Sequence, residues 1–567
     1  MDFATEIAKL IASAVDNIEV SEIREAIEVP ANKDMGDFAF PCFRLAKVLR
    51  KAPPLIAKEL AEKLEKPDFI SEIQVVNAYI NFFTDKTTYV KEVLSKVLEK
   101  NSDYIKSDIG RGKTIVIDYS SPNIAKPFHV GHLRSTVIGN ALYNLYSALG
   151  YDCVGVNHLG DWGTQFGKLI VAYKKWGDKE AVERDDIKEL SRIYVKFHDE
   201  AEKDPSLNDE ARLWLVKMQE GDSEALDLWK WFVEISMKEF NRIYDRLHIT
   251  FDSYAGESFY NDKMQAVVEE IKEKGLLTES EGAQIVDLEK YNMPPCLILR
   301  SDGGTLYPTR DIAAAFYRKK TYNFHKNIYV TALDQNLHFA QWFKVIELMG
   351  YDWAATDLVH VPFGLVSLGD GKLSTRKGHV VLMEDILNAA VEKTTGIIEE
   401  KNPNLPNKAE ISEQVGIGAV IFNDLYNSRI KNVVFDLERM LSFEGETGPY
   451  VQYSHARACS ILRKAGFEKP KTDLDYSLIN DEASVNVCKV LSELPSKVED
   501  AADKYEPYIL TRHIVEICKA FNKFYNENNI MASEGALKEA RLGIVYAVKS
   551  AIAQSLAILG IAAPEQM

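Results

Sequence analysis

Two histidines three residues apart stand in the stretch SSPNIAKPFHVGHLRST, at residues 120–136. The spacing of His129 and His132 places both imidazoles on one side of the first turn of a predicted helix. Unpaired backbone N–H groups and the helix dipole attract anions at such a helix start. Gly131 has no Cβ, so a flat base or ribose can approach the backbone between the two rings. The pattern therefore predicts a phosphate site.

Two other interpretations of the pair start from the same residues. A single histidine near a helix start is more often a surface or capping residue. A metal-binding pair of the H-E-x-x-H type is spaced by four residues rather than three. The elements and motifs around the pair must decide between these interpretations.

The elements that would position the pair form a βαβ unit. The run TIVIDYS is a β-branched strand, a helix follows up to Gly150, and DCVGVN is a second strand. The helix carries a buried stripe of apolar residues: Leu133, Val137, Ile138, Ala141, Leu142, Leu145 and Leu149. Parallel strands require such a crossover, so we expect a parallel sheet.

The same pattern returns later with strand NIYVTALD, a helix ending at Gly350, and a strand in DLVHVPFGLV. Between the halves, residues 175–290 are charged, tryptophan-rich and mainly helical by periodicity. We expect an α/β fold: a Rossmann-like parallel-sheet domain split by a helical insertion, a small α+β N-terminal domain and an all-α C-terminal bundle. The expected boundaries are 1–105, 106–385, a helical connector at 386–440, and 441–567.

Composition limits the possible classes of protein. The 567 residues are 46% hydrophobic, enough to bury several cores. A formal net charge of −17 argues against a general nucleic-acid coat protein but allows one basic channel. The six cysteines include no C-x-x-C pair, so we predict neither a disulfide framework nor a zinc cluster. The N-terminal stretch lacks the features of a signal peptide and no run reaches membrane-spanning length, so we expect a cytoplasmic protein.

HVGH resembles the HIGH signature of class I aminoacyl-tRNA synthetases. The longer blocks SSPNIAKPFHVGHLRST and VNHLGDWGTQFGKL resemble the version found in the arginyl-tRNA synthetases, and the resemblance covers essentially the whole chain. It implies that His129, Gly131 and His132 bind ATP and that both histidines stabilise phosphate charge. Mg²⁺ is expected as the counterion of ATP.

Downstream, GDGKLSTRKG resembles the KMSKS loop of the same family. Cations on a glycine-rich loop can neutralise pyrophosphate as it leaves. Lys372 and Ser374 match the motif, whereas a threonine occupies the place of the second lysine. The resemblance implies that Lys126, before the histidine motif, compensates. Arg376 and Lys377 are further candidates for ATP binding.

A planar guanidinium is best held by carboxylates and neutral acceptors. Asp118 ends the first strand, and Tyr307 and Asp311 are four apart on a predicted helix face. The resemblance implies that these three bind arginine together with Asn123, near its α-amino group or carboxylate, and Gln335. The family often has glutamate at the position of Asp118.

The activity that the resemblance implies has two steps. Arginine reacts with ATP to give arginyl-adenylate and pyrophosphate, and arginine then passes to the terminal 2′-hydroxyl of tRNA(Arg). The family usually needs tRNA present before activation, and a monomer is its usual state.

Bound RNA loops stack their bases on aromatic side chains beside cations. GETGPYVQYSHARACSILRKAG resembles the anticodon-binding domain of the family, and NAYINFF its surface for the tRNA elbow. We therefore expect these residues to contact tRNA: Tyr79, Asn81, Tyr450, Tyr453, Tyr525 and Met567.

Two alternatives remain at this point. Another enzyme with a HIGH-like motif would differ in its pocket, because a glutamate enzyme needs cations where Asp118 and Asp311 stand, and a cysteine enzyme needs zinc. A non-catalytic tRNA-binding paralogue should have eroded phosphate motifs. The altered KLSTR loop is the feature that favours this second alternative.

Overall fold

The computed structural model describes residues 2–15, 18–30, 32–301, 303–368, 381–468 and 472–567. The candidate residues Lys372, Ser374, Arg376 and Lys377 lie outside these ranges. The chain divides into two compact units. The first comprises Met1–Tyr104, Ala458–Glu493 and Ile517–Ala551; the second comprises Ile105–Arg457, Leu494–Glu516 and Ile552–Met567.

The first unit contains an antiparallel sheet of order β1-β3-β2 with helices packed on it. Its elements are α1 (Phe3–Ala12), α2 (Val20–Ala26), β1 (Phe38–Pro41), α3 (Ala46–Leu49), α4 (Pro53–Lys63), β2 (Ile70–Val76), β3 (Tyr79–Thr84) and α5 (Lys86–Lys100). Strands β2 and β3 form a hairpin that turns at Asn77, where φ is 52°. Asparagine tolerates this left-handed backbone better than most residues.

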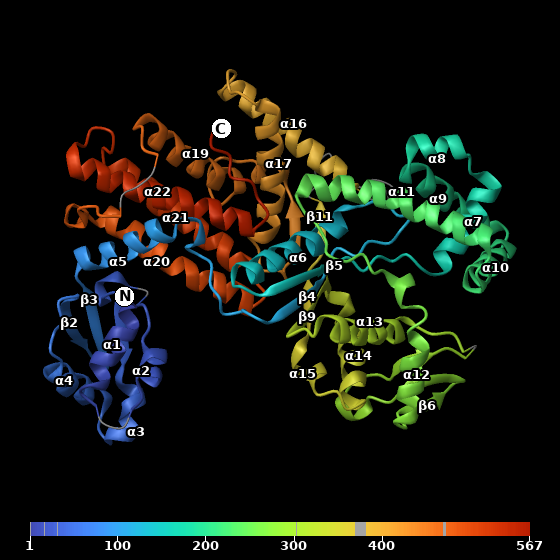
Figure 1. The fold of residues 1–567 in the computed structure, drawn as a ribbon, viewed down its shortest axis with the longest axis horizontal. Helices are drawn as coiled ribbons and strands as arrows, with labels where there is room; N and C mark the ends of the chain where they lie inside the picture. The colour runs from blue at the N-terminus through green and yellow to red at the C-terminus, as the bar shows by residue number, and fades with distance from the viewer. Residues whose placement is uncertain (1, 16–17, 31, 302, 369–380, 469–471) are drawn as a thin grey trace. The chain divides into compact units, whose positions relative to one another are not determined.

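The second unit contains the predicted parallel sheet, of order β10-β9-β4-β5. Its strands are β4 (Thr114–Asp118), β5 (Asp152–Val156), β9 (Lys326–Ala332) and β10 (Leu358–Phe363). Helix α6 (Val130–Ala148) joins β4 to β5 (Figure 1). The strand order reverses between β4 and β9. The carboxyl ends of strands at such a point form the crevice where open α/β sheets bind ligands.

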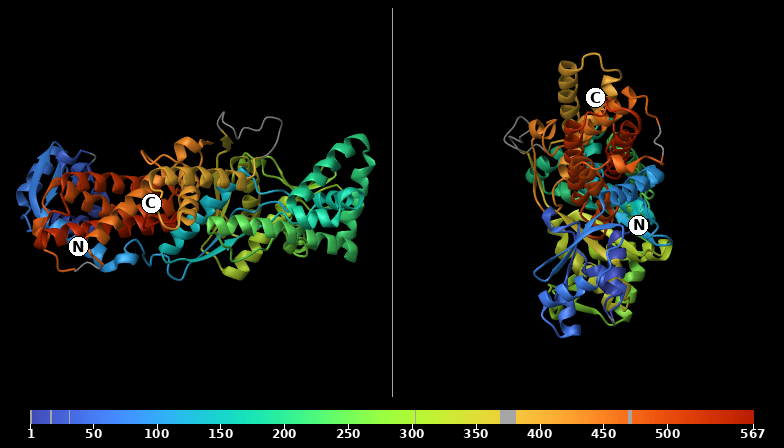
Figure 2. Two further views of the ribbon diagram at one scale, coloured as in Figure 1. Left: turned by 90° about the horizontal axis from the view of Figure 1, so that it is seen from above. Right: turned by 90° about the vertical axis from the view of Figure 1, so that its left-hand side faces the viewer.

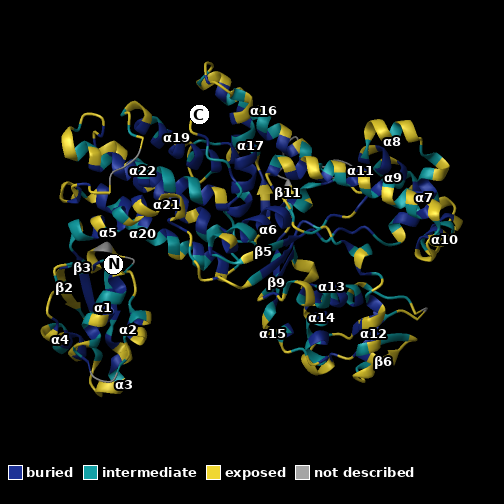
Figure 3. Ribbon diagram, viewed as in Figure 1, coloured by how far each residue is buried: buried dark blue, intermediate teal, exposed yellow. Residues whose placement is uncertain are grey.

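Helices separate the two halves of this sheet, as predicted. They are α7 (Thr164–Trp176), α8 (Lys179–Asp185), α9 (Ile187–Lys203), α10 (Ser206–Glu220), α11 (Ser223–Leu247) and α12 (Met264–Glu273). Helices α7 to α10 form a group of their own beside the sheet (Figures 1 and 2). The core strands β4 and β9 are buried, whereas much of α8 is exposed (Figure 3).

A small antiparallel sheet of order β6-β7-β8 was not predicted. Its strands are β6 (Leu277–Ser280), β7 (Ala283–Val286) and β8 (Cys296–Leu299). Each has four residues, too few for a period-two pattern to stand out from the surrounding helices. This sheet packs beside α13 (Tyr307–Tyr322) and α14 (Asn336–Leu348), and its apolar face joins their core.

Helices dominate the rest of the chain. They are α15 (Trp353–Asp357), α16 (Met383–Lys401), α17 (Lys408–Leu425), α18 (Leu437–Met440), α19 (Gly448–Lys464), α20 (Glu482–Asp503), α21 (Tyr508–Glu527) and α22 (Gly535–Ile558). Two three-residue strands, β11 (Val366–Leu368) and β12 (Val433–Phe435), pair in parallel. The predicted fold class is confirmed in all three of its parts. Within the described ranges, no helix has the length and apolar character needed to cross a membrane.

Candidate active site

The loop that joins β4 to α6 has a strained backbone. Three of its non-glycine residues, Ser120, Ser121 and Ala125, have φ values of 68°, 47° and 66°. Left-handed backbone at such residues costs about 1–3 kcal/mol each and persists only where the surroundings enforce it. Ser120 N–H donates to Ser135 Oγ over 2.9 Å, and Ser121 N–H donates to Asn157 Oδ1 over 3.1 Å. These contacts hold the loop at the carboxyl end of β4.

His129 and His132 cap the start of α6 reciprocally. Gly131 N–H donates to His129 Nδ1 over 3.0 Å, and His129 N–H donates to His132 Nδ1 over 3.1 Å. The two ring centroids are 3.9 Å apart. A Cβ on Gly131 would lie 2.8 Å from the His129 ring. The packing of that ring is therefore a second reason for glycine, besides the predicted approach of a ligand.

These bonds determine which form of each imidazole is present. Both Nδ1 atoms accept an N–H, so the neutral ring carries its proton on Nε2. Burial, with the nearby charges of His129 and Lys126, lowers the pKa of His132 to about 3. Burial and the charge of Lys126 also lower the pKa of His129. Both rings are neutral at pH 7 and offer Nε2–H donors beside the helix N-terminus, where phosphate oxygens bind well.

The chain returns to this helix start after residue 380. Val130 N–H donates to the carbonyl of Val381 over 3.2 Å, and Met383 N–H donates to the carbonyl of Phe128 over 2.9 Å. Residue Leu382 forms a bridge with His129. The segment that follows the predicted KMSKS-like motif is thus hydrogen-bonded directly to the histidine motif.

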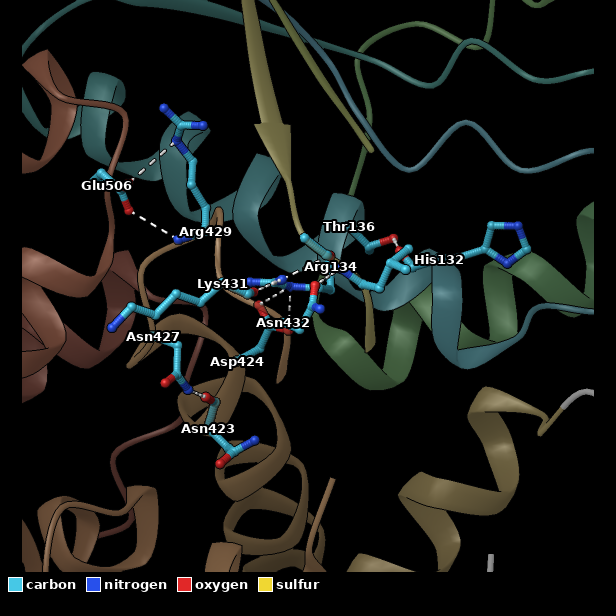
Figure 4. A network of polar contacts seen from close by, with 12 residues as sticks. His132, Arg134, Thr136, Asn423, Asp424, Asn427, Arg429, Lys431, Asn432 and Glu506 are labelled. Atoms are coloured by element: carbon cyan, nitrogen blue, oxygen red, sulfur yellow. Dashed lines mark hydrogen bonds and ion pairs between the residues drawn. The ribbon is translucent and has the colours of Figure 1, made fainter. Parts of the chain in front are cut away.

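Arg134, one turn into α6, anchors the helix in a buried polar network (Figure 4). Its Nε lies 3.0 Å from Oδ2 of Asp424 on α17, and both side chains are 0% exposed. Its Nη1 donates to the carbonyls of Gly364 and Lys431 over 2.9 and 2.7 Å. These two carbonyls directly precede the β11–β12 pair. One guanidinium therefore joins α6, α17 and the strand that leads into residues 369–380.

Asp118 is held by a guanidinium of the protein itself. Its Oδ2 lies 2.8 Å from Nη2 of Arg318, and its Oδ1 accepts from Ser121 Oγ over 2.9 Å. The side chains of Asp118 and Arg318 are 10% and 1% exposed. This predicted arginine contact is already neutralised and nearly enclosed. The Nη2 atom of Arg318 also lies 3.4 Å from Nδ1 of His158.

Asp311 is more accessible. It lies on α13 one turn after Tyr307, which is 66% exposed, so the predicted helical spacing is present. Oδ2 of Asp311 lies 2.5 Å from Nε2 of His338 on α14, and both side chains are 25% exposed. The first turns of α13 and α14 therefore present an acid to solvent at the crevice.

Glu257, which the sequence did not single out, is a third acid of this region. It lies in a short 3₁₀ turn, and its Oε2 is 2.8 Å from Nη1 of Arg310. Burial raises its pKa to about 7; Arg310 opposes this rise, and the charges of Asp311 and Asp161 add to it. No motif distinguishes this glutamate in the sequence, because the fold alone brings its turn beside α13.

The other predicted pocket residues are exposed. Gln335 ends the 3₁₀ turn before α14, and Asn123 and Lys126 lie on the β4–α6 loop. Asn123 forms a bridge with Gly160, so the loop is tied to the segment after β5. Lys126 is close enough to both histidines for its charge to lower their pKa values.

Three predicted tRNA contacts lie in the first unit. Tyr79 is half-buried and Tyr525 is 39% exposed. Asn81 is only 2% exposed, and its amide donates to Sδ of Met35 over 3.9 Å. Alternation along β3 places Asn81 on the face opposite the core residues Ile80 and Phe82, and this face is covered as well, in part by Met35. Asn81 as it stands therefore offers no surface to RNA.

Three other predicted contacts lie in the second unit. Tyr453 is 40% exposed, and its ring lies 4.8 Å from Cζ of Arg457. Tyr450, one turn earlier on α19, is half-buried. Met567 packs against an apolar cluster formed around Ile398, and its carbonyl accepts from Asn402 over 3.4 Å. The last residue of the chain thus has a fixed position.

No group of three or more histidine, cysteine, aspartate or glutamate side chains that could hold a metal ion occurs in the part of the chain that the structure describes. Of the six cysteines, Cys153 is half-buried and the other five are buried. The described residues of the site offer hydrogen-bond donors, carboxylates and cations.

Models of three protein families match the chain. The model described as the catalytic domain of tRNA synthetases class I (R) matches residues 93–437. The DALR anticodon binding domain matches residues 451–567, and the arginyl tRNA synthetase N terminal domain matches residues 5–84.

Curated relatives resemble the chain over its full length. The arginine–tRNA ligases of Halothermothrix orenii and Alkaliphilus metalliredigens are 55% and 56% identical to it, each over 567 residues that cover 100% of both chains. Among solved structures, the arginyl-tRNA synthetase of Thermus thermophilus superposes with a TM-score of 0.82 at 25% identity and covers 99% of both chains.

Proposed function

This chain belongs to the class I arginyl-tRNA synthetases, and from that premise we propose which of its residues carry out each step of the reaction. It is an arginine–tRNA ligase: it activates arginine with ATP and transfers it to the 2′-hydroxyl of the terminal adenosine of tRNA(Arg).

For the amino acid, we propose that Asp311 accepts the substrate guanidinium together with Tyr307. Asp311 combines a charge with an accessible carboxylate. Asn123 and Gln335 bind the α-amino and carboxylate end from the β4–α6 loop and the α14 turn. Asp118 shapes the pocket from beneath, because its own charge is matched by Arg318.

For activation, a carboxylate oxygen of arginine attacks the α-phosphorus of ATP in line, and the bond to the β-phosphate oxygen breaks. Pyrophosphate leaves with the Mg²⁺ that enters as part of the MgATP substrate. The Nε2–H groups of His129 and His132 donate to phosphate oxygens as charge develops on them. Lys126 supplies a nearby cation, and Gly131 keeps the backbone accessible.

Further cations come from the KMSKS-like motif. Lys372, Arg376 and Lys377 carry the charge and Ser374 adds a hydroxyl donor. The hydrogen bonds of Val381–Met383 to the histidine motif support this role, because they attach the following segment to the phosphate site.

For transfer, the 2′-hydroxyl of tRNA attacks the carbonyl carbon of arginyl-adenylate, AMP leaves, and the hydroxyl proton is released. We propose that tRNA is held at its anticodon by Tyr450, Tyr453, Tyr525 and Met567. Tyr79 contacts the elbow of tRNA, and Asn81 does so after a local rearrangement near Met35. The protein acts as a cytoplasmic monomer, as the resemblance to the family implies.

The observation that carries the phosphate assignment is the pair of backbone-capped, neutral imidazoles at the start of α6. Loss of one preorganised donor of this kind lowers a rate by about 10² to 10³. We expect His132→Ala to lower arginine-dependent ATP–pyrophosphate exchange, measured with tRNA present, by that factor while arginine binding stays within about threefold of the wild type. His248→Asn, at an exposed helix C-terminus, is the control. Unchanged exchange in His132→Ala would refute the assignment.

A further inference from the structure

Two acids of the proposed arginine pocket have basic side chains of the protein as partners, and the two pairs differ in exposure. Asp118 faces Arg318, whose side chain is 1% exposed. Asp311 faces His338, and both side chains are 25% exposed. The second pair is therefore open to a ligand.

His338 lies where it can act on the pocket. It follows Gln335 by three residues at the start of α14, so both side chains lie on the same side of the first turn. Its ring packs edge-on against Phe339, with centroids 5.5 Å apart. Phe339 in turn stacks on His360 at 4.3 Å. The imidazole is thus supported from behind while Nε2 contacts Asp311.

We propose that His338 is a positioning residue of the arginine site: its Nε2–H holds Oδ2 of Asp311, which orients the carboxylate for the substrate guanidinium. This inference depends on the assignment of Asp311 in the proposed function. An ionised carboxylate offers about four acceptor positions, so one bond from His338 leaves room for two from a guanidinium.

The test is direct calorimetric titration of arginine into the full-length protein at pH 8. The variants are His338→Gln, which keeps an N–H donor, and His338→Ala, which does not. His248→Asn is the remote control.

At pH 8 we expect His338→Ala to weaken arginine binding about 10-fold, since a hydrogen bond to a charged group is lost. His338→Gln should stay within about threefold of the wild type. Wild-type affinity in His338→Ala, or an equal loss of affinity in His338→Ala and His338→Gln, would overturn the inference.

Asp311→Asn separates this inference from the assignment on which it depends. If that variant binds arginine as tightly as the wild type, the assignment of Asp311 itself fails. If Asp311→Asn loses binding while His338→Ala does not, only the role of His338 is wrong.

Discussion

Asp118 and Asp311 are both acids of the proposed arginine pocket, but their surroundings give them different roles. Asp118 and its partner Arg318 are nearly enclosed, whereas Asp311 and His338 are a quarter exposed. Removing one partner of a buried ion pair leaves an uncompensated charge, which costs about 3–5 kcal/mol. Removing an accessible charge instead weakens whatever ligand it binds.

We therefore expect the same substitution to lower stability at Asp118 and to weaken arginine binding at Asp311. Asp118→Asn should lower the free energy of unfolding by about 3–5 kcal/mol, because the Arg318 charge loses its counterion. Asp311→Asn should change it by less than about 1 kcal/mol and weaken arginine binding about 100-fold or more. Denaturant unfolding and calorimetric arginine titration of both variants measure the two effects, and each variant controls for the other. Equal loss of stability in both would contradict the distinction.

The sequence predicted several residues of the candidate site, but not the side chains that contact them. The spacing of His129 and His132 and the acid at Asp118 were predicted, and the fold places all three at the carboxyl edge of the sheet. The partner Arg318 was not predicted, because the pairing arises only when α13 packs on β4. Glu257 was missed for the same reason. Strand alternation places Asn81 on the face opposite the core residues Ile80 and Phe82, and the sequence did not indicate that this face is covered too.

Helix α6 shows how one element is fixed from several sides. Its start carries the two histidines, and one turn later Arg134 bonds Asp424 and the carbonyls of Gly364 and Lys431. A guanidinium can satisfy several acceptors in a fixed plane, which an ammonium cannot. This side chain therefore helps to fix the position of the phosphate site relative to the β11–β12 pair.

We expect Arg134→Lys to lower the free energy of unfolding of the second unit by about 3–5 kcal/mol, because lysine cannot reach the acceptors on both strand segments at once. The matched control is Arg212→Lys. The side chain of Arg212 is 72% exposed and pairs with Asp209 on the surface of α10. An exposed pair contributes at most about 1 kcal/mol. Chemical unfolding followed by tryptophan fluorescence compares the two, since the tryptophans are in the second unit. Equal midpoints for the two variants would show that the network adds nothing to stability.

Among the helices and strands, hydrophobic periodicity predicted the long and regular elements. The βαβ units, their parallel order and the C-terminal helices follow from apolar spacing over ten or more residues. The short strands β6 to β8, β11 and β12 were not predicted, because three or four residues show no distinct hydrophobic period. The Arg134 network was not predicted either, because Asp424 is 290 residues from Arg134 in the sequence.

For the whole molecule, the balance of charge must be reconciled with RNA binding. With 68 basic and 85 acidic residues, the formal net charge is −17, so a long-range field does not favour a polyanion. Binding must therefore depend on local surfaces with cations and aromatic rings. The pair Tyr453 and Arg457 on α19 is such a surface, because the guanidinium lies 4.8 Å from the ring centroid and donates to the Tyr453 hydroxyl over 3.3 Å.

Stacking of one base on an aromatic side chain contributes about 1–3 kcal/mol. We therefore expect Tyr453→Ala to weaken tRNA binding about 10-fold or more, measured by fluorescence anisotropy at one fixed salt concentration because phosphate contacts depend strongly on salt. Tyr453→Phe keeps the ring and loses the hydroxyl, so it should stay within about threefold of the wild type. Arginine binding should be unchanged in both, since neither variant alters a residue of the proposed pocket. If alanine and phenylalanine weaken tRNA binding equally, the hydroxyl rather than the ring makes the contact, and the stacking role proposed for Tyr453 is wrong.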